Sequence, residues 1–223
     1  MAGLEFQEIA HFRRGTYGWG VQGRGGPNRC GPTRVLLLRH GESASNAART
    51  HSLENPRLTE LGREQAGAWD GPLGTLGIQC MLVSPLLRAV ETAALTGLWR
   101  QLPMELCAHT RELYWAHAEN SLGNEEQVRA LCDELCGCTD RVSGIARAFD
   151  GGVPEHGSIA ALKRVLRGRT EQTVLIVCHW GVIKELCGEE TENGTLVECA
   201  RCQATGELRV QCRRAPIQCR HAS

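Results

Sequence analysis

The chain has 223 residues, of which 42% are hydrophobic, 22% are charged and 4% are aromatic. This length suits one domain with a buried core, and the composition is that of a globular protein, which excludes a chain disordered throughout. Because 25 basic and 25 acidic residues cancel, the chain offers no overall field that would hold a nucleic acid or an anionic membrane.

The first 32 residues are rich in glycine and arginine and show no periodicity, which predicts a flexible lead-in. Its arginines could contact RNA, but cations on such an arm are more often simply solvated, so we expect no nucleic-acid partner. This segment lacks the apolar core of a secretory signal, and no apolar run approaches the roughly 18 residues of a membrane span. We therefore expect a cytoplasmic protein without a membrane partner.

From residue 33 onward, short apolar runs alternate with longer amphipathic stretches, as in strands joined by crossover helices. In chain order, the pattern predicts strands at 34–38, 79–83, 103–106, 173–178, 195–200 and 207–211. It predicts helices at 59–71, 85–99, 125–136, 139–149, 158–167 and 180–187. The predicted fold is an α/β three-layer sandwich, with a mostly parallel central sheet and helices on both faces. We expect one domain over 33–211 and a C-terminal tail over 212–223.

The first predicted strand ends in Arg39-His40-Gly41, which places polar groups at its carboxyl end. Open α/β sheets bind their ligands at that edge. A neutral imidazole of His40 can attack phosphorus there, and the Arg39 guanidinium offers a fork of donors to phosphate oxygens. Taken alone, the tripeptide is a weak signal and favours an exposed strand end without a function.

Two later strands are followed by residues of similar chemistry. After the second predicted strand, Pro85 suits a first helical turn and Arg88 follows near the positive end of that helix, where anions bind. After the fourth, His179 stands where an imidazole could hydrogen-bond a phosphoryl oxygen. Since parallel strands share an edge, these groups can converge with His40.

Together these residues resemble the motifs of the histidine phosphatase superfamily, also called the phosphoglycerate mutase-like family, over about residues 33–211. The motifs that carry the resemblance are Arg39-His40-Gly41-Glu42, Asn46, Leu58-Thr59-x-x-Gly62-x-x-Gln65-Ala66, Ser84-Pro85-x-x-Arg88-Ala89-x-x-Thr92-Ala93 and Cys178-His179-Trp180-Gly181. The resemblance is closer to the small eukaryotic phosphatase-like branch than to the mutases, through Trp180 and Asn193-Gly194-x-x-Val197-Glu198.

The resemblance implies that His40 is phosphorylated, that Arg39, Arg88 and His179 form the phosphate pocket, and that Asn46 lies near the phosphate. The family draws its proton donor from a carboxylate between the last two motifs. Glu112 fits that position best, with Glu119, Glu125 and Glu126 as alternatives.

The segments 46–57 and 113–124 are expected to form the rim of the pocket, where family members differ most. Trp180 could stack on an organic group or close the pocket wall.

The predicted activity is metal-independent hydrolysis of a phosphate monoester, with no cofactor, through a phosphohistidine on His40. The substrate is expected to be a phosphorylated small molecule or a phosphoprotein. A phosphoglycerate mutase-type phosphotransferase is one alternative, disfavoured by the short linker between Asn46 and Leu58-Thr59. A noncatalytic phosphate-binding scaffold is another. The sequence assigns neither a particular substrate nor an oligomeric state.

Twelve cysteines are present, scattered along a chain much larger than a disulfide-stapled scaffold, so reduced thiols are expected. Cys199-x-x-Cys202 with Cys212 and Cys219 could hold a zinc ion, although a second Cys-x-x-Cys pair is missing. The alternative is a β-hairpin that carries small apolar side chains.

Overall fold

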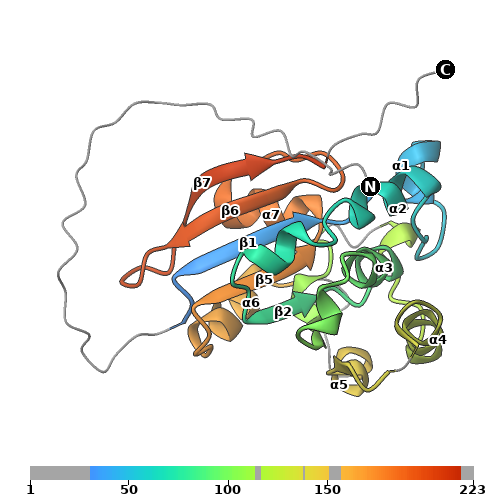
Figure 1. Ribbon diagram of the computed structural model, residues 1–223. Coiled ribbons are helices and arrows are strands. Elements are labelled where there is room, and N and C mark those ends of the chain that lie inside the picture. Colours follow the sequence, from blue (N-terminus) through green and yellow to red (C-terminus); the bar gives the residue numbers. More distant parts are fainter. Residues whose placement is uncertain (1–30, 114–116, 138, 151–156, 217–223) are drawn as a thin grey trace.

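The protein is built on one seven-stranded sheet with the strand order β4-β3-β2-β5-β1-β6-β7 (Figure 1). This computed structural model describes residues 31–113, 117–137, 139–150 and 157–216. The predicted lead-in up to residue 30 and Cys219 therefore lie outside the described residues. The strands are β1 (Arg34–Arg39), β2 (Cys80–Val83), β3 (Met104–Leu106), β4 (Val142–Ser143), β5 (Thr173–Cys178), β6 (Leu196–Arg201) and β7 (Leu208–Arg214).

The five strands from β4 to β1 run parallel, and β6 and β7 add an antiparallel edge. Strands β1 and β5 are neighbours at the centre, paired from Arg34 with Thr173 to Arg39 with Cys178. The residues that follow these strands, His40 and His179, therefore leave the sheet side by side.

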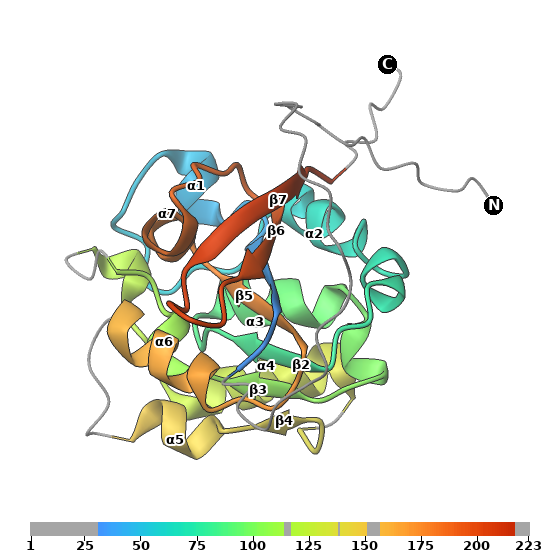
Figure 2. The same cartoon turned by 90° about the vertical axis from the view of Figure 1, so that its left-hand side faces the viewer.

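Helices cover both faces of the sheet, which confirms the predicted three-layer α/β fold (Figure 2). The helices are α1 (Ala44–Ala48), α2 (Glu60–Gly67), α3 (Leu87–Leu95), α4 (Glu125–Cys136), α5 (Ile145–Phe149), α6 (Ile159–Arg167) and α7 (Trp180–Cys187). Alternate side chains of β1 belong to different cores: Leu36 and Leu38 pack with α3, α4 and α5, whereas Val35 and Leu37 pack with α6 and α7. Such alternation is what a sheet buried on both faces requires.

Four sequence predictions were wrong in detail. The predicted helix 59–71 ends as α2 at Gly67. The predicted helix 139–149 begins instead as edge strand β4, which pairs with β3, and Gly144 at φ +76° separates it from α5. The predicted helix 85–99 ends at Leu95, shortly before Gly97 at φ +69°. Strand β7 runs three residues past the predicted end at 211, to Arg214.

Helix α1 was not predicted, because its five residues are too few to show helical periodicity. None of the helices among the described residues has both the length and the apolar composition that crossing a bilayer demands.

Candidate active site

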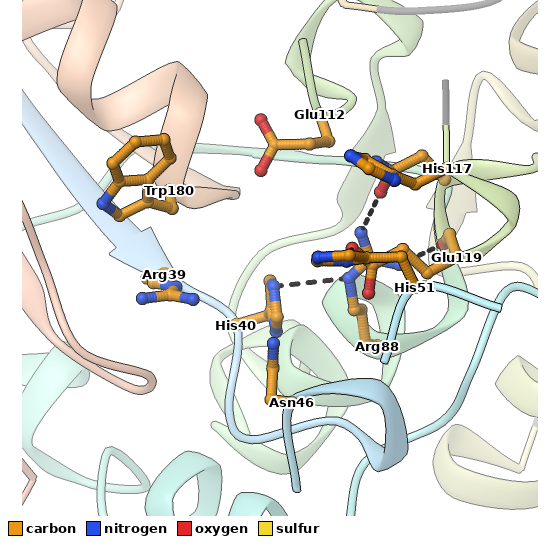
Figure 3. Close-up of a pocket in the computed structure, with 10 residues that line it drawn as sticks. Arg39, His40, Asn46, His51, Arg88, Glu112, His117, Glu119 and Trp180 are labelled. Carbon is orange, nitrogen blue, oxygen red and sulfur yellow. Dashed lines mark hydrogen bonds and ion pairs between the residues drawn. The ribbon is translucent and has the colours of Figure 1, made fainter. Parts of the chain in front are cut away.

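A pocket of about 220 Å³ lies where strand β1 ends and helix α7 begins (Figure 3). The residues that line it are Arg39, His40, Asn46, His51, Arg88, Glu112, His117, Glu119, Asn120 and Trp180. Five of the six candidate site residues predicted from the sequence are in this set. The sixth, His179, is not in the lining but lies next to His40: the centroids of their rings are 5.1 Å apart.

The buried imidazole of His40 has a defined tautomer. Its Nδ1 lies 2.7 Å from the carbonyl oxygen of Gly41, and because a carbonyl only accepts, the proton must be on Nδ1. The other nitrogen, Nε2, therefore carries a lone pair, which accepts a hydrogen bond of 3.3 Å from Arg88 Nε. Burial, assisted by Arg88 and Arg39, holds the pKa of His40 well below its usual range. His40 thus presents a neutral nitrogen.

Close backbone packing holds the loop after β1. A Cβ atom at Gly41 would lie 2.2 Å from the carbonyl oxygen of Gly62, and one at Gly62 would lie 2.0 Å from that of Glu42. Only glycines allow this approach, which fixes the start of α2 against the loop. The Gly41 amide also donates to Thr92 Oγ1 at 3.0 Å.

Asn193, which lies shortly before β6, stabilises the same loop through hydrogen bonds from its side-chain amide. Its Nδ2 lies 3.2 Å from the carbonyl oxygen of His40, 3.4 Å from that of Gly41 and 3.1 Å from Asn46 Oδ1. Asn46 Oδ1 in turn accepts from the Ser43 amide, as the third residue of a capping box on α1. Sequence reasoning noted Asn193 only as part of a motif and missed this contact.

The two guanidiniums of the pocket are held by different partners. Arg88 donates from Nη1 to the carbonyl oxygen of Glu119 and from Nη2 to Asn120 Oδ1, both at 2.7 Å. Burial lowers the pKa of Arg88 to about 10, so it stays charged near neutral pH. Arg39 donates from Nη1 to the carbonyl oxygen of Thr191, and its buried Nε has no hydrogen-bond partner among the described residues.

His179 is fully buried and precedes the first residue of α7. Its Nε2 lies 2.7 Å from Ser84 Oγ, and its Nδ1 has no hydrogen-bond partner among the described residues. Burial, together with Arg88, keeps the pKa of His179 well below its usual range. The Ser84 hydroxyl can donate to Nε2, and the ring proton would then stand on Nδ1.

Glu112 is a half-buried carboxylate of the pocket wall. Burial raises the pKa of Glu112, against the opposing effects of hydrogen bonds from the amides of Leu113 at 2.8 Å and Gly181 at 3.4 Å and of the nearby guanidiniums. Glu119 also lines the pocket, but its Oε1 accepts from His51 Nδ1 at 2.7 Å. Glu125 and Glu126, the other two alternatives, are not among the lining residues.

Residues from both predicted rim segments line the pocket. His51 comes from segment 46–57, and His117, Glu119 and Asn120 come from segment 113–124. His51, His117 and Asn120 were not identified individually, since only their place in these two segments pointed to them.

Cys199, Cys202 and Cys212, the proposed zinc ligands among the described residues, are not in the pocket lining. Within the described part of the chain, no three His, Cys, Asp or Glu side chains are grouped so as to hold a metal ion. Cys199 is instead buried in the core between β6 and the helices α6 and α7.

Comparison with known proteins gives the family. The model of the histidine phosphatase superfamily (branch 1) matches residues 35–195, so the chain belongs to this family, as its motifs predicted. An adenosylcobalamin/alpha-ribazole phosphatase of Escherichia coli is 28% identical over 160 residues, which cover 69% of this chain and 76% of that protein. The alpha-ribazole phosphatase of Shigella flexneri has a similar structure, with a TM-score of 0.51 and 25% identity over 79% of this chain and 95% of that one.

A shorter match joins the chain to a bifunctional protein of Mycobacterium tuberculosis, 47% identical over 64 residues. These residues are 28% of this chain and 18% of that protein, so the chain spans less than a fifth of that relative. The family and its phosphatase relatives support an enzyme with phosphatase or phosphotransferase activity.

Proposed function

We propose that this protein hydrolyses phosphate monoesters through a phosphohistidine formed at Nε2 of His40. The observation that carries the proposal is the fixed imidazole: Nδ1 donates to the Gly41 carbonyl, so the lone pair on Nε2 faces Arg88 in the pocket. A nucleophile must be unprotonated to attack, and the depressed pKa of His40 keeps it so at neutral pH.

The phosphoryl group would be held by Arg39, Arg88, His179 and Asn46. Two guanidiniums offset the nearly two negative charges of a phosphate monoester. His179 can donate from Nδ1, the atom left without a partner. Asn46 uses Oδ1 within the loop, and its amide nitrogen is therefore the group that would donate to a phosphoryl oxygen.

Two displacements at phosphorus make up the reaction. In the first, the Nε2 lone pair forms the N–P bond while the ester P–O bond breaks, and Glu112 gives its proton to the leaving alkoxide. As the N–P bond forms, the hydrogen bond from Arg88 Nε to His40 Nε2 breaks, and Arg88 Nε donates to a phosphoryl oxygen instead. In the second, water attacks phosphorus, Glu112 takes its proton, and the N–P electron pair returns to His40.

The test is chemical trapping of the intermediate. Enzyme mixed with a labelled phosphate ester and quenched should carry acid-labile, base-stable phosphate on His40. His40→Ala should lose label and turnover, while His109→Gln, outside the pocket, should retain both. Label on serine or cysteine would contradict the mechanism. Release of the label as inorganic phosphate, rather than its transfer to an added alcohol, separates a hydrolase from a mutase.

A further inference from the structure

Above the groups that hold the phosphoryl group, three aromatic side chains contribute to the pocket wall: His51, His117 and Trp180. We call these three residues the ring rim. Figure 3 shows Trp180 on the side of Arg39, with His51 and His117 across the pocket on the other side. The organic part of a bound ester, which points away from His40, would therefore pass between these rings.

The two histidines are held in place although they are exposed. Their ring centroids are 4.2 Å apart and their planes are inclined by 33°, so the two rings are in tilted contact. His51 Nδ1 donates to Glu119 Oε1 at 2.7 Å, and the amide of Glu119 donates to the carbonyl oxygen of His51 at 3.3 Å. The side chain of His51 is 63% exposed, so core packing does not explain its position. Its contacts with Glu119 and His117 hold it in place instead.

Trp180 is in contact with a cation of its own helix. It is the first residue of α7, and the ammonium of Lys184, one turn later, lies 4.5 Å from the centroid of its ring. Lys184 is itself held by Glu190 at 2.9 Å. The indole is therefore fixed directly next to His179, in the wall of the phosphate pocket.

The charges of the pocket argue against a second anionic group on the substrate. The two guanidiniums that line it, Arg39 and Arg88, belong to the phosphoryl site, and the Lys184 ammonium beside Trp180 is paired with Glu190. At the rim, any charge on His51 is offset by the Glu119 carboxylate in contact with it. A second phosphate or a carboxylate placed there would meet Glu119, whereas an uncharged ring would meet flat aromatic surfaces.

We propose that the ring rim binds a flat, uncharged heteroaromatic group in the organic part of the substrate. This inference rests on the proposed hydrolysis at His40 and gives it a substrate class: monoesters that carry one phosphate and one planar ring, in preference to sugar bisphosphates or phosphoglycerates.

The experiment compares two esters that share one leaving group. Adenosine 5′-monophosphate and ribose 5-phosphate both release a ribose 5′-alkoxide, and they differ by the base. We expect kcat/KM to favour the nucleotide by on the order of tenfold, the effect of one stacked base. His117→Ala and Trp180→Leu should bring the ratio toward one, whereas the ring-retaining His117→Phe and Trp180→Phe should preserve most of it. His117 is exposed, so its variants test the inference even if those of Trp180 unfold.

Three results would overturn the inference: a ratio near one in the wild type, a ratio unmoved by removal of either ring, or a preference for 3-phosphoglycerate over the nucleotide. Binding separates this inference from the proposed function. If neither these two esters nor p-nitrophenyl phosphate is hydrolysed, the proposed function fails. The inference on the rim can then be tested by binding. Calorimetry gives the dissociation constants of both esters for His40→Ala, and we expect the nucleotide to bind more tightly than ribose 5-phosphate by on the order of tenfold.

Discussion

Two carboxylates of the pocket stand in different surroundings, and this difference assigns them different roles. Glu112 is half-buried and accepts hydrogen bonds from backbone amides, and desolvation raises its pKa. Glu119 contacts the imidazole of His51. A proton donor to a leaving group needs a pKa raised toward the working pH, which favours Glu112.

Glu112→Gln should slow alkyl phosphates by about 10²–10⁴-fold, the usual contribution of general acid catalysis, and p-nitrophenyl phosphate far less. An alkoxide needs a proton in order to leave, and a nitrophenolate does not. The measurement is kcat/KM for one ester of each kind. Glu126→Gln, an exposed alternative on α4, is the matched control and should change neither value. Equal losses on both esters would leave Glu112 as a group that shapes the pocket, and Glu119 would be the next candidate.

The pH profile gives a second reading of the same residue. Glu112 must be protonated to act as the acid, so the rate on alkyl phosphates should fall as the pH rises through its raised pKa. His40 must be neutral, so the acidic limb should lie well below the usual range of histidine. In Glu112→Gln the basic limb should disappear. A basic limb that stays in place would assign it to another group.

The sequence located His40, Arg39, Arg88 and His179 because each follows a readable strand or begins a helix after one. It could not show the tautomer of His40, which depends on the direction of the Gly41 carbonyl. The contact of Asn193 with this loop was equally hidden, since it joins residues more than 140 positions apart.

At the scale of elements, the contact between the β1 loop and α2 explains a glycine of the Leu58-Thr59 motif. Gly62→Ala would push a Cβ to 2.0 Å from a backbone oxygen. Overpacking of this kind costs about 1–3 kcal/mol or more, and the backbone shift would also move His40. We expect a lower free energy of unfolding in urea and a lower kcat. Gly67→Ala in the same helix has nothing within 4 Å of the new atom, and it should be neutral or slightly stabilising.

If Gly62→Ala leaves both stability and kcat at the wild-type level, the close approach of α2 does not position His40. A loss of stability with an unchanged kcat would separate packing from catalysis, and the same contact would then be purely structural.

Long buried strands were predicted well because an apolar run of four to six residues bounded by polar groups is a strong signal. Short elements were not. Strand β4 has only two residues, and it exists because it can pair with β3 at the sheet edge. That pairing is a tertiary contact, and no local pattern in the sequence announces it.

For the whole molecule, the balance of 25 basic and 25 acidic residues hides a local concentration of positive charge. Arg39 and Arg88 line one pocket, although neither stands in a cluster of basic residues in the sequence. The fold creates this anion site by bringing the ends of several elements together, so net charge alone could not predict it.

Because the guanidiniums of Arg39 and Arg88 can supply the positive charge that Mg²⁺ provides in many other phosphatases, and neutral His179 can add a hydrogen bond, we expect activity without a metal ion. Enzyme dialysed against EDTA should hydrolyse an alkyl phosphate at the rate of untreated enzyme. Loss of activity on chelation and its return with a divalent cation would contradict the assignment of the pocket. Zinc released by the chelator, with a lower melting temperature and an unchanged rate, would instead indicate a structural cysteine site, for which Cys202→Ser is the first variant to test.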